Sequence, residues 1–150
     1  MIPQGIANSS PFIALGRIGH LDILQRSFEK LTIPTAVALE IGDVPPWVSI
    51  VPVVDSTKLL LFPSRIHRGE AEVISLGLEH PGAVLVLDDW YAREFSQREG
   101  LRVIGTIGLL LRAKRLNQIS LVLPIVRQLA DAGFRISKQV TEEIRTLAGE

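Results

Sequence analysis

Four carboxylates are the side chains in this sequence best suited to chemistry: Glu40, Glu70 and the adjacent pair Asp88 and Asp89. Two neighbouring ionised carboxylates repel each other, and removing either from water is costly unless a cation neutralises it. The chain has no cysteine and only three scattered histidines, so any metal site would be built from oxygen ligands. Such ligands suit Mg²⁺ or Mn²⁺, which can hold a water and a phosphodiester oxygen together. The acids therefore indicate phosphodiester hydrolysis.

The composition narrows the class of protein. The chain has 150 residues, 47% of them hydrophobic, and its 16 basic and 16 acidic residues cancel. This length predicts a single domain over residues 1–150. A net charge of zero argues against a nucleic-acid binder that works through bulk charge, although a local basic groove is compatible with it. The absence of cysteine excludes disulfides, zinc-thiolate sites and a cysteine nucleophile. No signal peptide and no spanning helix are predicted, so we expect a cytoplasmic protein.

The order of predicted elements alternates between strands and helices. Apolar residues at helical spacing (Ile18, Leu21, Leu24, Phe28 and Leu31) predict an amphipathic helix that Gly16 and Gly19 could divide. Strands are predicted at 3–7, 30–34, 47–53, 83–87 and 101–105, and further helices follow Pro34, Gly69, Asp89, Thr106, Ser120 and Ser137. Such alternation predicts an α/β sandwich with a central parallel sheet and helices on both of its faces.

Several polar residues are expected at one edge of this sheet. Asn8 and Ser10 follow the first strand, the aspartate pair follows the strand at 83–87, and Thr106 follows the last strand and is predicted to cap a helix. The functional crevice of an open parallel sheet lies beyond the carboxyl ends of its strands. Glu40 and Glu70 are expected on helices instead.

Each of these residues taken singly also has a structural explanation. Glu70 could interact with the positive end of a helix, Glu40 could be a solvated helix residue, and Asp89, Ser10 and Thr106 could be helix caps. Carboxylates gathered at one sheet edge, in contrast, should either protonate or bind a cation.

Several motifs in order resemble the PIN domain family, from about residue 6 to the C-terminus. They are "NSSPFIALGRIGHLDIL", "IPTAVALEI", "RGEAEVISLGLE", "VLVLDDWYAR", "LRVIGTIGLLLRAKR" and the closing "AGFRIS". The likeness is greatest to a subgroup related to VapC-type toxins. The resemblance implies a three-layer α/β/α fold, usually homodimeric, and a ribonuclease that depends on Mg²⁺ or Mn²⁺ held by a ring of acids.

The family motif has four acid positions. The resemblance places Glu40 at the second, Glu70 at the third and Asp89 (or its neighbour Asp88) at the fourth. Asn8 stands where the family usually has the first acid, and Ser10 matches the small hydroxyl residue that supports it. An amide oxygen can coordinate a cation but brings no charge. Three alternatives follow: weaker metal binding, compensation by Asp88, or a catalytically degenerate domain.

Basic residues in two segments are candidates for contacts to the RNA backbone. The candidates are Arg112, Lys114 and Arg115 in "RAKR", with Arg65, His67 and Arg68 before the "GEAE" segment. Both groups could equally be solvated surface. Arg93 could pair with one of the two aspartates.

The main hypothesis is an endoribonuclease that is the toxin of a toxin–antitoxin pair, with an antitoxin protein as partner. One alternative is a degenerate PIN-like dimer that binds protein or RNA without cleaving it. Another is a phosphoacceptor domain, but there the acid pair should follow the first strand, whereas here it comes near residue 88. A lysine closing the last strand is also missing.

Overall fold

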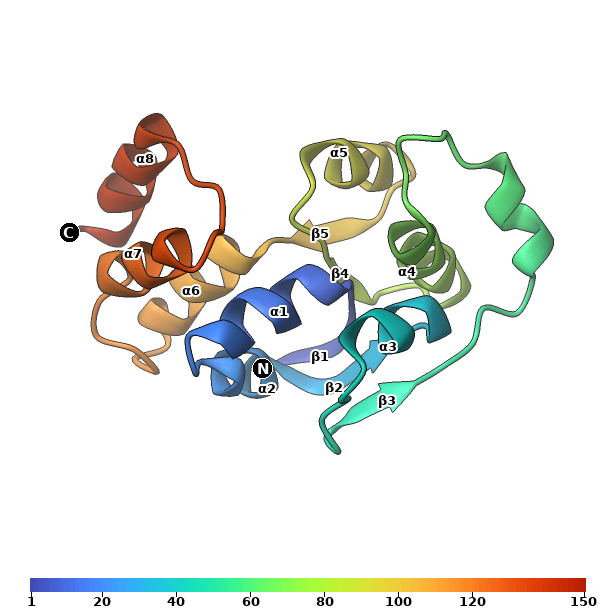
Figure 1. The fold of residues 1–150 in the computed structure, drawn as a ribbon, viewed down its shortest axis with the longest axis horizontal. Helices are drawn as coiled ribbons and strands as arrows, with labels where there is room; N and C mark the ends of the chain where they lie inside the picture. Colours follow the sequence, from blue (N-terminus) through green and yellow to red (C-terminus); the bar gives the residue numbers. More distant parts are fainter.

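A five-stranded parallel sheet forms the centre of the protein in a computed structural model that describes all 150 residues. The strands are β1 (Ile2–Ala7), β2 (Phe28–Ile33), β3 (Val48–Ile50), β4 (Val84–Val86) and β5 (Arg102–Ile104), in the spatial order β3-β2-β1-β4-β5. Every neighbouring pair is parallel. Helices flank the sheet (Figure 1), which confirms the predicted three-layer α/β/α fold.

The helices connect the strands and then extend beyond the sheet. They are α1 (Ser9–Arg17), α2 (Leu21–Ser27), α3 (Thr35–Ile41), the short 3-10 helix η1 (Ser56–Leu61), α4 (Arg68–Glu79), α5 (Trp90–Arg98), α6 (Thr106–Arg115), α7 (Leu123–Asp131) and α8 (Lys138–Ala148). In Figure 1, α7 and α8 lie at one end of the molecule and η1 at the other. No helix has the length and apolar character needed to cross a lipid bilayer.

The core explains why the central strands read as continuous apolar runs. One cluster of 32 buried hydrophobic residues extends from Ile6 to Ile144. All three residues of β4 are buried, as expected for a strand covered on both faces. Between the ends of β1 and β4, Asn8 N–H donates to Val86 O at 3.1 Å, which keeps the two strand ends together.

Three details of the predicted elements are wrong. Phe28 continues the helical spacing but lies in β2, as does Leu31 of the strand predicted at 30–34, because α2 ends at Ser27 and the chain then pairs with β1. Thr106 is the first residue of α6 rather than its cap, and Gly105 occupies the cap position. The strand predicted at 47–53 is also shorter, since β3 ends before Pro52, which has no N–H for a ladder.

Candidate active site

The carboxyl edge of the sheet brings Asn8, Glu40 and Glu70 together, although they come from three separate segments. Glu40 lies near the end of α3, and Ser9 Oγ donates to its Oε2 at 2.6 Å. A Cβ built on Gly69 would lie 2.6 Å from Glu40 Oε1 and 3.1 Å from Asn8 Oδ1. Glycine is therefore needed at 69, where two site oxygens approach the backbone beside Glu70.

Glu70 is buried in the first turn of α4, with 6% of its surface exposed. The His67 N–H donates to Glu70 Oε1 at 3.0 Å. Burial raises the pKa of Glu70 above its ordinary value, and the negative charges of Asp89 and Glu40 raise it further, while the His67 hydrogen bond opposes the shift. The three carboxylates are thus close enough to influence one another.

The two adjacent aspartates occupy different environments. Asp88 is held on all sides: Ser10 Oγ donates to Oδ2 at 2.8 Å, Thr106 Oγ1 donates to Oδ2 at 2.7 Å, and Thr106 N–H donates to Oδ1 at 2.7 Å. Asp89 is exposed and caps α5, with only Oδ2 accepting a hydrogen bond from Ala92 N–H at 2.9 Å. Asp88 is therefore occupied in joining α1 and α6 to the end of β4, and Asp89 has a free oxygen.

The resemblance implies that Ser10 supports the residue at position 8. In the structure, the Ser10 hydroxyl donates to Asp88 instead. Thr106 is buried with its hydroxyl and N–H both on Asp88. Arg93 and Asp88 both border Gly105, but no ion pair joins them. The expected Arg93–aspartate pair is therefore not formed.

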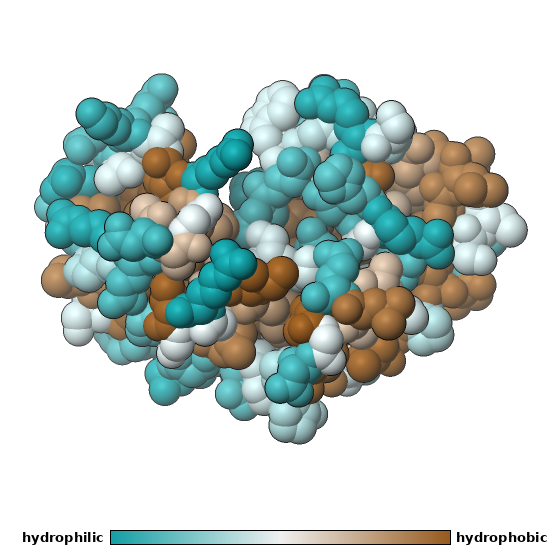
Figure 2. Space-filling model, in the orientation of Figure 1, coloured by the Kyte–Doolittle hydropathy of each residue, from teal (hydrophilic) through white to brown (hydrophobic).

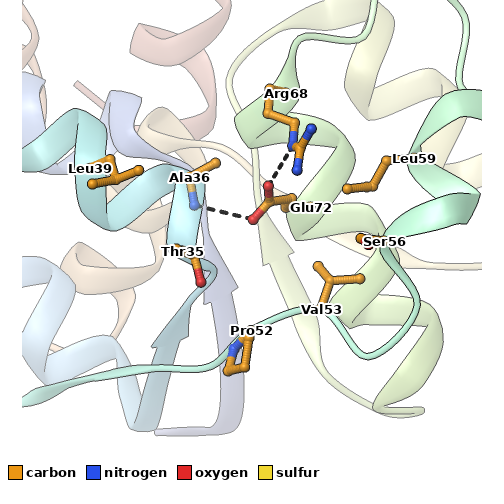
Figure 3. Close-up of a pocket in the computed structure, with 9 residues that line it drawn as sticks. All are labelled: Thr35, Ala36, Leu39, Pro52, Val53, Ser56, Leu59, Arg68 and Glu72. Atoms are coloured by element: carbon orange, nitrogen blue, oxygen red, sulfur yellow. Dashed lines mark hydrogen bonds and ion pairs between the residues drawn. The ribbon is translucent and has the colours of Figure 1, made fainter.

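A second buried carboxylate, Glu72, was missed by the sequence analysis. Its Oε1 accepts a hydrogen bond from Ala36 N–H at 3.1 Å, and its Oε2 pairs with Arg68 Nε at 2.6 Å (Figure 3). Glu72 thereby links the first turn of α3 to α4, the helices that carry Glu40 and Glu70. Beside this link lies a cavity of about 330 Å³ between α3, α4 and the segment around η1. The sequence signal was the second acid of "GEAE", two residues after Glu70.

The basic residues expected to contact RNA are dispersed. Arg112 borders a cavity with Ile2, Val84 and Arg102, which begin β1, β4 and β5, so it lies at the opposite edge of the sheet. Lys114 Nζ pairs with Glu150 at 2.9 Å and donates to Ala148 O at 2.7 Å.

The remaining two candidates differ in position. Arg115 ends α6, about 14 Å along the helix from Thr106. Arg68, which begins α4 and is largely exposed, lies near the acids, with its Nε on Glu72.

The candidate site offers a divalent cation oxygen ligands only. No group of three or more His, Asp or Glu side chains is close enough to bind one ion directly. Mg²⁺ usually keeps several waters and uses only one or two protein carboxylates, so such a group is not required. The oxygens of Asn8, Glu40, Glu70 and Asp89 are of the type that suits a hydrated hard cation.

A family model for the PIN domain matches residues 4–150. No curated protein and no solved structure gives a significant match to the chain. The family match covers nearly the whole sequence and agrees with the parallel sheet and its edge of acids. The chain therefore belongs to the PIN domain family.

Proposed function

We propose that this protein is an endoribonuclease that depends on Mg²⁺ or Mn²⁺ and hydrolyses phosphodiester bonds of RNA. PIN domains are generally nucleases and typically use divalent metals. One observation on this chain carries the proposal: side-chain oxygens of Glu40 and Asn8 both lie close to Gly69 at the carboxyl edge of the sheet. Gly69 directly precedes Glu70, so the three polar side chains lie in one place. A site of this kind serves hydrolysis better than simple RNA binding, because ionised acids repel phosphate.

In the proposed site, Glu40, Glu70 and Asp89 hold the cation and Asn8 adds a neutral oxygen. The bound cation would supply positive charge to the phosphodiester and acidify a water. Ser9 orients Glu40, and the N–H of His67 orients Glu70. The raised pKa of Glu70 means that metal binding, which needs the ionised carboxylate, should release a proton and tighten as the pH rises.

Asp88 is proposed to position the site rather than to bind the cation, because its hydrogen bonds to Ser10 and Thr106 engage both of its oxygens. Asp89, in contrast, has an oxygen that accepts no hydrogen bond. We therefore favour Asp89 as the fourth acid.

The test is cleavage of single-stranded RNA by purified protein with Mg²⁺ or Mn²⁺, stopped by EDTA. Asp89→Asn and Glu40→Gln should abolish cleavage while the circular dichroism spectrum stays unchanged. Asp131→Asn, an exposed acid at the end of α7, is the matched control and should keep full activity. Full activity in Asp89→Asn or Glu40→Gln would contradict the proposed site.

The finer proposal is a toxin of the VapC type that acts as a homodimer in the cytoplasm and is neutralised by an antitoxin. Hydrophobic residues gather over η1 on the right side of Figure 2, where Leu60 and Leu61 are 87% and 83% exposed, and such a surface suits a protein partner. Growth arrest on expression, relieved by a protein encoded beside the gene, would support this proposal. Light scattering gives the oligomeric state.

Asn8 favours a second candidate function, a degenerate PIN domain that binds RNA or protein without cleaving it. The neutral amide leaves the site one charge short of the family pattern. This candidate predicts a folded protein that cleaves no RNA at any metal concentration. Recovery of cleavage in Asn8→Asp would identify the lost charge as the cause.

A further inference from the structure

The surface beside Asp89 carries an exposed tryptophan that the fold does not use. Trp90 is the first residue of α5 and is 67% exposed. The other tryptophan of the chain, Trp47, is half-buried and stacks on Phe12 with ring centroids 6.3 Å apart. An exposed indole next to an acidic site is a large flat surface that lacks a partner within the protein.

The residue after Trp90 on α5 carries a second aromatic ring, and a cation lies over that ring. The Arg65 guanidinium is 4.4 Å from the ring centroid of Tyr91. Arg65 comes from the segment before α4. The contact between Phe62 and Phe95, whose rings are tilted by 46° with centroids 5.5 Å apart, fixes that segment to α5. The two segments that supply Glu70 and Asp89 therefore also supply this group of flat side chains.

The proposed function requires the acidic edge to hold RNA, yet few of the predicted basic side chains are free there to contact phosphates. Arg112 lies at the opposite edge of the sheet, Lys114 pairs with Glu150, and Arg68 shares its Nε with Glu72. Aromatic stacking does not suffer from repulsion between acids and phosphates, and it contributes about 1–3 kcal/mol for each unpaired base. It also selects single strands, since the bases of a duplex are already stacked and covered.

We propose that Trp90, together with the Arg65–Tyr91 pair, is a stacking site for an unpaired base of the RNA substrate next to the scissile phosphate. The inference rests on the proposed function, in that it names how that site holds its substrate. It also explains how a chain with no net charge binds a polyanion: affinity comes from base stacking more than from counterion release. Binding should accordingly depend only weakly on salt concentration.

The first experiment reads binding directly, without cleavage. In a Trp47→Phe variant, tryptophan fluorescence comes from Trp90 alone. With EDTA present to prevent cleavage, a short oligoadenylate should quench this fluorescence saturably, and duplex RNA of the same length should not. Saturable binding of oligoadenylate, detected by polarisation of a labelled oligonucleotide, with no change in Trp90 emission would overturn the inference.

The second experiment compares variants in the same polarisation assay. Trp90→Ala should raise the dissociation constant about 5- to 150-fold, the range that 1–3 kcal/mol corresponds to, and Trp90→Phe should recover most of the loss. Leu147→Ala removes an apolar side chain of α8 that is 72% exposed, and it should leave the dissociation constant unchanged. An unchanged dissociation constant in Trp90→Ala would also overturn the inference.

The two proposals fail in different ways. Normal cleavage by Trp90→Ala, with an unchanged KM, would overturn the stacking proposal and leave the ribonuclease proposal standing. Quenching of Trp90 fluorescence by RNA without any cleavage would overturn the ribonuclease proposal and support the stacking site. A protein that binds no RNA at all contradicts both.

Discussion

Asn8 is the residue that most affects what this site can do. Its backbone is fixed by the hydrogen bond to Val86, and its side-chain oxygen lies beside Gly69. In the proposed site this oxygen would be a neutral ligand. A carboxylate at position 8 would strengthen cation binding and would also add to the repulsion on Glu70.

Asn8→Asp should tighten Mn²⁺ binding by on the order of 1–3 kcal/mol, because an ionised oxygen replaces a neutral one at the same place. Isothermal calorimetry at neutral pH measures the change. The control is the same substitution at Asn117, at the far end of α6, which should leave the affinity unaltered. Equal affinities in wild type and Asn8→Asp would mean that residue 8 is not a ligand.

Gly69→Ala tests the close approach of oxygens to α4. The added methyl group would meet Glu40 Oε1 at 2.6 Å, so the carboxylate has to move. A displacement of about 1 Å at a reacting centre can lower the rate on the order of 100-fold, so cleavage should fall sharply while the melting temperature changes little. Gly16→Ala in α1, where the nearest side-chain atoms are 3.9 Å away, is the control. A fully active Gly69→Ala variant would show that the position of Glu40 is not critical.

At the scale of elements, the site depends on how α3 and α4 are held together. Glu72 accepts the N–H of Ala36 at one contact (Figure 3). At the other, the absence of a side chain at Gly69 lets Glu40 approach α4, so the two helices meet at two points. A buried carboxylate at such a junction is destabilising unless it is paired. Here the backbone donor and Arg68 supply that pairing.

Glu72→Ala leaves the half-buried N–H of Ala36 without its partner and should lower the free energy of unfolding by about 1–3 kcal/mol. Urea unfolding measures this cost. Glu72→Gln keeps an oxygen for the N–H and should recover much of the stability, although the pairing with Arg68 is weakened. Equal stability of Glu72→Ala and wild type would show that the link does not hold the helices.

The element order was predictable, but the ends of several elements were not. The strands at 3–7 and 83–87 were read correctly because a run of apolar β-formers is a local signal. The spacing of Phe28 fits 3.6 residues per turn and therefore predicts a helix, and only pairing with β1, a long-range contact, places this residue in a strand.

Part of the site was also predictable, for a related reason. Asn8 and Asp89 follow strands, and parallel strands end at one edge, so their proximity follows from topology. The roles of Ser9 and Glu72 depend on which side chain of a helix faces which neighbour, a tertiary property with no pattern in the local sequence. The same holds for Lys114, whose position in a basic motif gave no sign of its pairing with Glu150.

For the molecule as a whole, Glu150 joins three helices. Its carboxylate pairs with Lys114 of α6 and accepts the N–H groups of Val122 and Leu123 at the start of α7, at 2.7 and 3.0 Å, just after α8 ends. The hydrogen bond from Lys114 is the largest cause of the low pKa of Glu150, which is about 2. The helices outside the sheet are thus fixed to α6, which begins at the acid edge.

Glu150→Gln should lower the melting temperature at neutral pH. The folded-state pKa of Glu150 is about 2 against an ordinary value of 4.5, so its stabilisation is complete above 4.5 and lost as the pH falls through about 2. The difference between wild type and variant, followed by calorimetry, should shrink over that range. Glu143→Gln, an exposed acid of α8, is the control. A difference that persists undiminished at pH 2 would contradict this account.

The strand order has a consequence for the protein during its synthesis. β1 is the central strand, and it acquires its second neighbour, β4, only after β2 and β3 have been made. Asp88 is then steadied by Thr106, a residue that follows β5. A nascent chain that ends before Thr106 therefore carries Glu40 and Glu70 but lacks the two Thr106 donors that hold Asp88, so the candidate site is incomplete on the ribosome until this residue has emerged.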